Sequence, residues 1–485
     1  MKKKYVRWTL WTIASPFILF IILCILIYLP PIQNFLVDKA AVYASEATGM
    51  NISVGRISLS FPLNLVVTNV DAASLHNDTL LSVRRLQVNV QLLPLLKKQV
   101  EVDGISLQGA TVNSNDLIHG MKLNGTLGEL FISSHGVALD PETAIVNKVL
   151  LKDTDLSLCL NDTAAADTAA SDTTYWKIIL QDIDLQNVSF ALDMPLDSLS
   201  LAASLDNAIL RDGLIDLHKS AYSLQTFRIE NGRVRYDNGK PLAADSLSSG
   251  LDPSHIALTD IGVKLDSLYY GGRNMKAIIS QFVLKERSGV EIVSATGRMV
   301  SNDKVLRVPS LKLETRDSYL ELNAAMDWNA LDFKDEGLVS ARLMADIGKP
   351  DVVRFMGRMD EKFVRQYPSE PLRIRTGIDG DLNKLKLTTL TAELPGALGL
   401  FARGELTHLT DSLLRGGDIT LEAETKDLKF VSTLAEGIEI PYGTRLEGKF
   451  TMAGAKMGTD LLLMQPEAQA VAAADTIPIT VYNDS

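Results

Sequence analysis

The feature that most constrains this chain is a strict alternation of apolar and polar residues that begins after residue 50. In residues 85–92 (RLQVNVQL) every second side chain is apolar, and the same alternation recurs in 156–160, 320–328 and 419–424. Successive side chains of a strand point to opposite faces of the sheet, so this period predicts half-buried antiparallel strands with one apolar and one polar face. The expected fold class is therefore mostly β.

A second pattern recurs at a larger scale. The segments 102–113, 150–160, 183–192 and 227–236 each pair a short strand with a Gly, Asn or Asp and then a second strand whose phase shifts. An extra residue flips side chains to the other face unless a bulge or tight bend absorbs it, and Gly or Asn suits such a bend. The segments predict degenerate repeats that stack side by side into one long sheet.

The N-terminus predicts a membrane anchor. Residues 8–29 contain no charge, and at ~1.5 Å per residue such a helix crosses a hydrocarbon core of ~30 Å. The basic residues within 1–7 favour a cytoplasmic N-terminus. The alternative is a cleaved signal peptide, but its apolar region is shorter and ends at small residues, which this run does not show. An uncleaved anchor is favoured.

The remaining segments depart from the strand pattern. Residues 32–49 have helical spacing, as either a cap on the following domain or a spacer from the bilayer. The helical pattern near 350–367 indicates either a mobile gate over a binding surface or a helix packed on the end of the sheet, and the second is favoured. The expected organisation is a cytoplasmic N-terminus (1–7), a transmembrane anchor (8–29), a short amphipathic helix (32–49), an N-terminal β-region (50–161), a mobile linker (162–173), a continuing β-region (174–455) and an irregular tail (456–485), as in a truncated or short chain.

The composition excludes several kinds of chemistry. The formal net charge of −11 lacks the basic footprint that nucleic acids need, and two cysteines cannot build a zinc site or a disulfide framework. No phosphate-binding loop, nucleophile elbow or HExxH motif is present. The pairs Asp153/Asp155 and Asp379/Asp381 are interpreted as turn or solvent-face carboxylates, because no third metal ligand is evident. We expect no enzyme activity, cofactor or metal.

Several segments together resemble the AsmA-like family, and most closely its TamB-like (translocation and assembly module) members. The similar segments are the anchor, 51–70 (NISVGRISLSFPLNLVVTNV), 78–113, 348–387 and 387–398. The resemblance covers roughly residues 1–450. It implies a single-pass anchor in the inner membrane of a Gram-negative bacterium, followed by a long, curved, taco-like β-sheet in the periplasm.

The resemblance also implies a function. The concave face of such a sheet is a hydrophobic groove for phospholipid acyl chains moving between the inner and outer membranes, and TamB-like members are tied to outer-membrane protein assembly and secretion with a barrel partner. The candidate lipid-facing positions are Leu86, Val88, Val90 and Leu92. The alternative is a non-transporting envelope scaffold that recruits an outer-membrane barrel by strand addition, which would have a filled sandwich core and an accessible edge strand.

Overall fold

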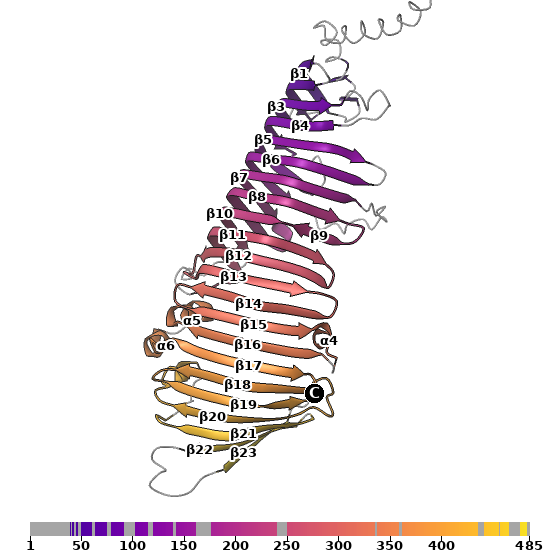
Figure 1. Ribbon diagram of the computed structural model, residues 1–485. Helices are drawn as coiled ribbons and strands as arrows, with labels where there is room; N and C mark the ends of the chain where they lie inside the picture. The colour runs from indigo at the N-terminus through magenta and orange to yellow at the C-terminus, as the bar shows by residue number, and fades with distance from the viewer. Residues whose placement is uncertain are drawn as a thin grey trace, which may run out of the picture. The chain divides into compact units, whose positions relative to one another are not determined.

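The computed structural model of the chain contains two compact units, residues 1–218 and 219–485. The described residues are 39, 41–42, 45–46, 50–60, 64–74, 79–91, 102–114, 120–138, 142–161, 176–239, 250–334, 337–357, 361–434, 441–454, 456–464 and 476–482. The first unit, hereafter the N-terminal unit, and the second, the C-terminal unit, are described separately. Both are built almost entirely of strands, which confirms the predicted class (Figure 1).

The N-terminal unit is a sheet whose strands pair in chain order. Its strands are β1 (Asn51–Ser60), β2 (Asn64–Ala73), β3 (Thr79–Val90), β4 (Val102–Asn113), β5 (Met121–Ala138), β6 (Thr143–Leu160), β7 (Lys177–Met194) and β8 (Leu199–Asp216), with a 3-10 turn η1 (Pro195–Asp197) between the last two. Every pair from β1 to β8 is antiparallel except β6 and β7, which are parallel. The predicted antiparallel sheet is therefore confirmed apart from this one pair.

The C-terminal unit continues the same plan with antiparallel neighbours throughout. Its strands are β9 (Ala221–Leu224), β10 (Thr226–Asp237), β11 (His255–Gly271), β12 (Asn274–Glu286), β13 (Glu291–Ser301), β14 (Val305–Thr315), β15 (Tyr319–Asp327), β16 (Leu338–Ile347), β17 (Leu372–Asp381), β18 (Lys384–Leu394), β19 (Leu398–Thr407), β20 (Gly416–Thr425), β21 (Arg445–Ala453), β22 (Lys456–Met464) and β23 (Thr476–Tyr482). Strands β10 to β23 pair in chain order, and β9 pairs with the end of β11 that β10 leaves free.

Short polar residues close the turns of the C-terminal unit. The Asn302 side chain accepts hydrogen bonds from the backbone N–H groups of Lys304 and Val305, at 2.9 Å each, between β13 and β14. Asp381 accepts from the N–H groups of Asn383 and Lys384 between β17 and β18. A side-chain oxygen that accepts hydrogen bonds from backbone N–H groups two and three residues further on stabilises a tight turn between two strands. The Asp381 carboxylate is thus used by a turn, as the sequence predicts.

The predicted phase shift lies where the repeated segments carry Gly, Asn or Asp. In the four segments Gly109, Asp153, Asn187 and Asn231 have φ values of 61°, 51°, 51° and 54°. A left-handed residue within a strand sends two successive side chains to the same face. In β2, where Asn69 has a φ of 54°, Val67 and Val70 therefore share a face although they are three residues apart. The sequence interpretation of these residues is confirmed.

The helices of the C-terminal unit lie at the ends of strands (Figure 1). They are α4 (Trp328–Leu331), α5 (Lys349–Met356), α6 (Glu361–Gln366) and a 3-10 turn η3 (Val431–Thr433). Helices α5 and α6 connect the antiparallel neighbours β16 and β17, so the predicted helix near 350–367 is two short helices on the end of the sheet. The buried core of this unit gathers beside α6, around Phe363, which is 1% exposed.

The N-terminal predictions are mostly outside the described residues. This holds for the cytoplasmic segment 1–7, the anchor 8–29 and the linker 162–173. Of the predicted helix 32–49, the described residues Lys39, Ala41, Val42, Ser45 and Glu46 are helical. Within the part of the chain that is described, no helix has the length and apolar character needed to cross a bilayer.

The predicted irregular tail at 456–485 is wrong where the structure describes it. Strand β22 pairs with β21, and β23 pairs with β22. The sequence misled because residues 461–464 (LLLM) have no alternation, whereas the edge of β21 can pair with a further strand through the backbone whatever the side-chain pattern. Residues 476–482 (TIPITVY) are rich in β-branched side chains, and a strand at the end of a sheet tolerates Pro478.

Candidate functional site

The predicted positions on β3 belong to rows of apolar residues that cross the whole N-terminal unit. In the two rows through Leu86 and Val88, each residue lies opposite the next on the neighbouring strand. The first row is Ile57, Val67, Leu86, Leu107, Leu130, Leu151, Leu185 and Ala208, and the second is Leu59, Leu65, Val88, Ile105, Ile132, Val149, Ile183 and Leu210. These rows define the apolar face of the unit.

Three of the four predicted positions are described. Leu86 lies opposite Val67 and Leu107, and Val88 lies opposite Leu65 and Ile105. Val90 lies opposite Val102, beyond a break in register between β3 and β4. Leu92 lies outside the described residues. The other members of the rows could not be predicted from the sequence, because alternation gives the face of a side chain but not its neighbour on the next strand.

Two further rows extend the apolar face beyond the left-handed residues. One is Val54, Val70, Val83, Ala110, Leu127, Thr154, Val188 and Leu205, and the other is Ile52, Ala72, Leu81, Val112, Gly125, Leu156, Phe190 and Ala203. Thr154 is the one polar side chain in them, and it donates a hydrogen bond to the Lys152 carbonyl oxygen at 3.2 Å. An apolar ligand that lies on these four rows would therefore leave almost no polar side chain without a hydrogen-bond partner.

The first two rows of this face are mostly half-buried by the described residues. Of the sixteen residues in the first two rows, only Ala208 is buried and the others are half-buried. A filled sandwich buries the facing rows of two sheets about 10 Å apart. The first two rows do not show such burial, whereas Ala72, Val83, Ala110 and Thr154 in the other two rows are buried.

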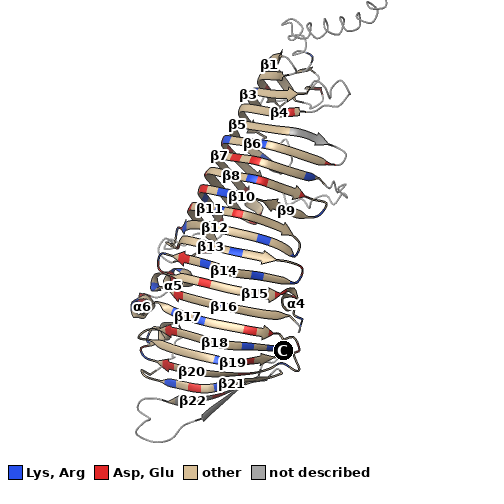
Figure 2. Ribbon diagram, in the orientation of Figure 1, with Lys and Arg blue, Asp and Glu red and all other residues tan. Residues whose placement is uncertain are grey.

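The opposite face is mainly polar. One row across β1–β8 is Arg56, Thr68, Arg85, Gln108, Glu129, Lys152, Gln186 and Asn207, and another is Ser53, Asp71, Ser82, Thr111, Thr126, Asp155, Ser189 and Ser204. On β3 itself, Arg85 donates to Gln87 at 3.2 Å and Gln87 donates to Asn89 at 3.3 Å. Charged residues recur along the strands rather than gathering at one site (Figure 2). The row through Gln87 is mixed, since it contains Ser58, Val66, Gln87, Ser106, Phe131, Leu150, Asp184 and Ile209. The two polar rows are mostly exposed.

The C-terminal unit has an apolar face of its own. Its first row runs over nine strands, and the next rows along the strands are also mainly apolar. The first row is Ala295, Leu313, Leu320, Ala345, Ile374, Ala392, Leu400, Ala423 and Leu446. Only Ala295 and Ala345 in this row are buried, so most of the face is uncovered by described residues.

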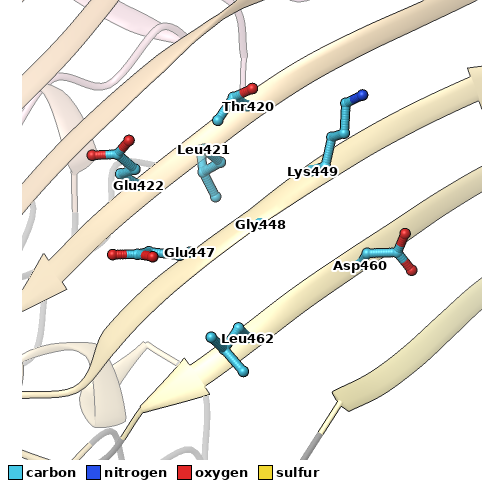
Figure 3. Close-up of a pocket in the computed structure, with 8 residues that line it drawn as sticks. All are labelled: Thr420, Leu421, Glu422, Glu447, Gly448, Lys449, Asp460 and Leu462. Carbon is cyan, nitrogen blue, oxygen red and sulfur yellow. The ribbon is translucent and has the colours of Figure 1, made fainter. Parts of the chain in front are cut away.

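A shallow hollow of about 520 Å³ lies on the polar face of β20–β22 (Figure 3). Glu422 and Glu447 lie directly opposite each other there, and Lys449 lies opposite Asp460. Both Glu447 and Lys449 already have ionic partners, since Arg445 contacts Glu447 at 2.8 Å and Lys449 contacts Asp418. Exposed ion pairs contribute little binding energy. This hollow is therefore a weaker candidate site than the apolar faces.

The described residues contain no metal-binding constellation, since no three His, Cys, Asp or Glu side chains come together. The carboxylates that the sequence singled out on β6 have strand neighbours as partners. Asn187 donates to Asp153 and Ser189 donates to Asp155, at 2.8 Å each. These pairs link β6 to β7 across their parallel ladder and stabilise the sheet.

No protein-family model, curated protein or solved structure matches the chain. The arrangement of the apolar faces is therefore the basis for any functional assignment.

Proposed function

We propose that this chain carries phospholipid acyl chains on the apolar faces of its sheets. The observation that supports the proposal is the unbroken run of apolar rows through Leu86 and Val88, which described residues leave uncovered. Each large apolar side chain that leaves water contributes about 1.5–3 kcal/mol. Extended apolar surfaces of this kind mark sites of interaction rather than ordinary protein surface.

Acyl chains suit such a face because they require no hydrogen bonds. Backbone N–H and C=O groups of β2–β4 are already paired along the ladder, so the surface offers neither donors nor acceptors to a ligand. A carbohydrate, peptide or nucleotide would bury polar groups without partners, at a cost of about 1–3 kcal/mol each. The chemistry of the face therefore selects a hydrocarbon ligand. Transfer along it needs no catalytic residue.

The cellular setting belongs to the same proposal. An anchor at 8–29 would hold the chain in the inner membrane, with its curved, groove-like sheets in the periplasm. The acyl chains would then move between the inner and outer membranes, and the protein would serve outer-membrane assembly and secretion beside a barrel partner. The resemblance to AsmA-like proteins supports this setting.

The proposal is tested by photo-crosslinking in the native envelope. A photoreactive amino acid is placed at Val88 and, in a matched variant, at Gln87, its neighbour on the opposite face. We expect phospholipid adducts at Val88 and few or none at Gln87, because only the first position faces the apolar rows. Lipid that is not covalently bound is first extracted from the sample. The remaining lipid adducts are then identified by mass spectrometry.

Two outcomes contradict the proposal. Equal lipid labelling at both positions indicates general contact with the bilayer rather than a lipid-binding face. Protein adducts alone at Val88, or no adduct at all, indicate a packed scaffold and favour recruitment of a partner by strand addition.

A further inference from the structure

In the C-terminal unit, one end of the apolar face is covered by aromatic side chains. Leu372, Leu394 and Leu398 extend the face by one more row, because each lies two residues beyond a member of the first row on the same strand. Leu372 and Leu398 pack against a buried cluster that includes Leu394. We call this cluster the aromatic stop, and its members are Phe363, Tyr367, Leu394, Ala397, Leu428 and Phe430. The segments that carry α6 and η3 thus close the face at this end of the strands.

The aromatic stop is tightly packed. The ring centroids of Phe363, Tyr367 and Phe430 lie 5.1–5.8 Å apart, in tilted and edge-to-face arrangements. Such aromatic pairs contribute beyond the area they bury. Phe363 is almost completely buried. The cluster is therefore a rigid wall rather than a loose covering loop.

Polar contacts fix the neighbouring helix α5 to the sheet. Asp351 is 1% exposed and accepts hydrogen bonds from the hydroxyls of Thr315 and Ser318 in the β14–β15 turn. Arg354 bonds Asp351 at 3.1 Å and Asp317 at 2.9 Å. At the start of the helix, Lys349 donates to the carbonyl oxygen of Tyr367 at 2.7 Å, which ties α5 directly to the aromatic stop. A buried carboxylate with several partners resists displacement. This argues against a freely moving gate.

The apolar face continues from the aromatic stop to the opposite ends of the strands. On β17 it runs from Ile374 through Thr376 and Ile378 to Gly380, and then meets Asp381 in the turn. At ~3.4 Å per residue the six steps from Ile374 to Gly380 span ~20 Å. The chains of one bilayer leaflet occupy ~15 Å, half of a ~30 Å hydrocarbon core. The uncovered stretch is therefore long enough for an acyl chain of one leaflet to lie along the strands.

We propose that the aromatic stop seats the methyl ends of bound acyl chains and so sets the chain length that the C-terminal unit accepts. The headgroups then lie at the opposite ends of the strands, beside the β17–β18 turn. This inference rests on the proposed lipid-binding function and adds direction and chain-length specificity to it. Phe363, Tyr367 and Phe430 are its specificity-determining residues.

The test uses the full-length protein and two phospholipid probes. One probe carries a photoreactive diazirine on the terminal carbon of an acyl chain, and the other carries it near the headgroup. We expect the terminal probe to label peptides around Phe363, Phe430 and Leu372. The headgroup-proximal probe is expected to label Leu385 and Leu406, which lie opposite each other at the far end of the face.

Variants add a second measurement. Each variant is given a mixture of phospholipids with shorter and longer acyl chains, and the ratio of the two bound lipids is measured. Phe430→Ala and the milder Phe430→Leu are compared with Leu385→Ala, which changes the far end of the face. We expect the Phe430 variants to shift preference toward longer chains, by about fourfold for each methylene group newly accommodated. The Leu385 variant is expected to weaken binding of both lipids without changing that preference.

The outcomes separate the two proposals. Labelling that is uniform or reversed along the strands, or no change in preference in Phe430→Leu, overturns the aromatic stop while lipid binding stands. Absence of labelling by either probe anywhere on the C-terminal unit overturns both, because no acyl chain then occupies the face.

Discussion

Adjacent residues on β3 have opposite chemical surroundings. Val88 lies between Leu65 and Ile105 in an apolar row, whereas Gln87 bonds Arg85 and Asn89 on the other face. A carboxylate at position 88 has no partner within the row, whereas one at position 87 lies beside Arg85, whose guanidinium already bonds Gln87. The cost of burying a charge without a partner thus differs sharply between two neighbouring positions.

We predict that Val88→Asp reduces the phospholipid that copurifies with the protein by at least tenfold. A tenfold loss corresponds to about 1.4 kcal/mol, and burying a carboxylate without a partner costs more than that. Gln87→Asp should leave lipid loading unchanged and serves as the matched control. Lipid is quantified by mass spectrometry, and thermal unfolding is recorded for both variants. Similar losses in the two variants, or a loss that follows unfolding, would count against the lipid-binding face.

Tyr367 provides a residue-scale prediction about pH. Burial raises the pKa of its hydroxyl above the usual value of 10.0. The folded protein therefore holds this proton more tightly than the unfolded chain does, so the stabilisation is complete below pH 10 and is lost as the pH rises through the folded-state value. Tyr367→Phe should match the natural chain at neutral pH and lose less stability above pH 10. The check is urea denaturation at several pH values, and identical pH dependence would refute it.

At the scale of elements, the left-handed residues decide whether a long strand keeps its apolar side chains on one face. On β7, Asn187 has a φ of 51° and donates a hydrogen bond to Asp153 on β6. Leu185 and Val188 stand on either side of it in neighbouring apolar rows. Without this conformation, one of the two would turn to the polar face.

We predict that Asn187→Val destabilises the protein by about 1–2 kcal/mol more than Asn187→Gly, because a β-branched residue resists positive φ and glycine adopts it freely. Both variants lose the bond to Asp153, so the comparison isolates the backbone. Strand propensity alone favours valine and predicts the opposite order. Chemical denaturation of the two full-length variants decides between these orders.

At the scale of the whole molecule, each unit leaves an apolar sheet face without a described covering layer. The rows through Leu86 in the N-terminal unit and Ile374 in the C-terminal unit remain half-buried. Apolar surface of this extent marks a site where a ligand, membrane or partner binds, or a surface prone to aggregation. On the proposed function, bound lipid also contributes to the stability of the fold.

We predict that delipidation lowers the thermal midpoint of the protein and promotes self-association, and that added phospholipid reverses both. A ligand at one hundred times its Kd stabilises by about 2.7 kcal/mol. Differential scanning calorimetry and sedimentation velocity provide the measurements, with a soluble zwitterion that lacks acyl chains as control. A midpoint unaffected by phospholipid would contradict this view.

Much of the fold is predictable from local pattern. The apolar residues that alternate around Val88 lie opposite apolar residues of β2 and β4, and the Gly, Asn and Asp residues of the repeats mark the left-handed positions. The tail was predicted wrongly because β22 forms by pairing with an available edge, which no local pattern records. Of the four candidate positions, Leu86 and Val88 lie in continuous apolar rows, and Val90 lies beyond a break in register.

Local pattern is enough to predict a two-faced, mostly antiparallel β-protein, because the period of side chains along a strand depends only on the strand itself. Only the tertiary structure decides which strands are neighbours, that β6 and β7 run parallel, and that apolar residues align into rows across each sheet. It also decides that the residues around Phe363 close one end of the apolar face, while the rows near Ile374 stay uncovered. Register and covering layers depend on contacts between residues far apart in the chain, and alternation carries no information about them.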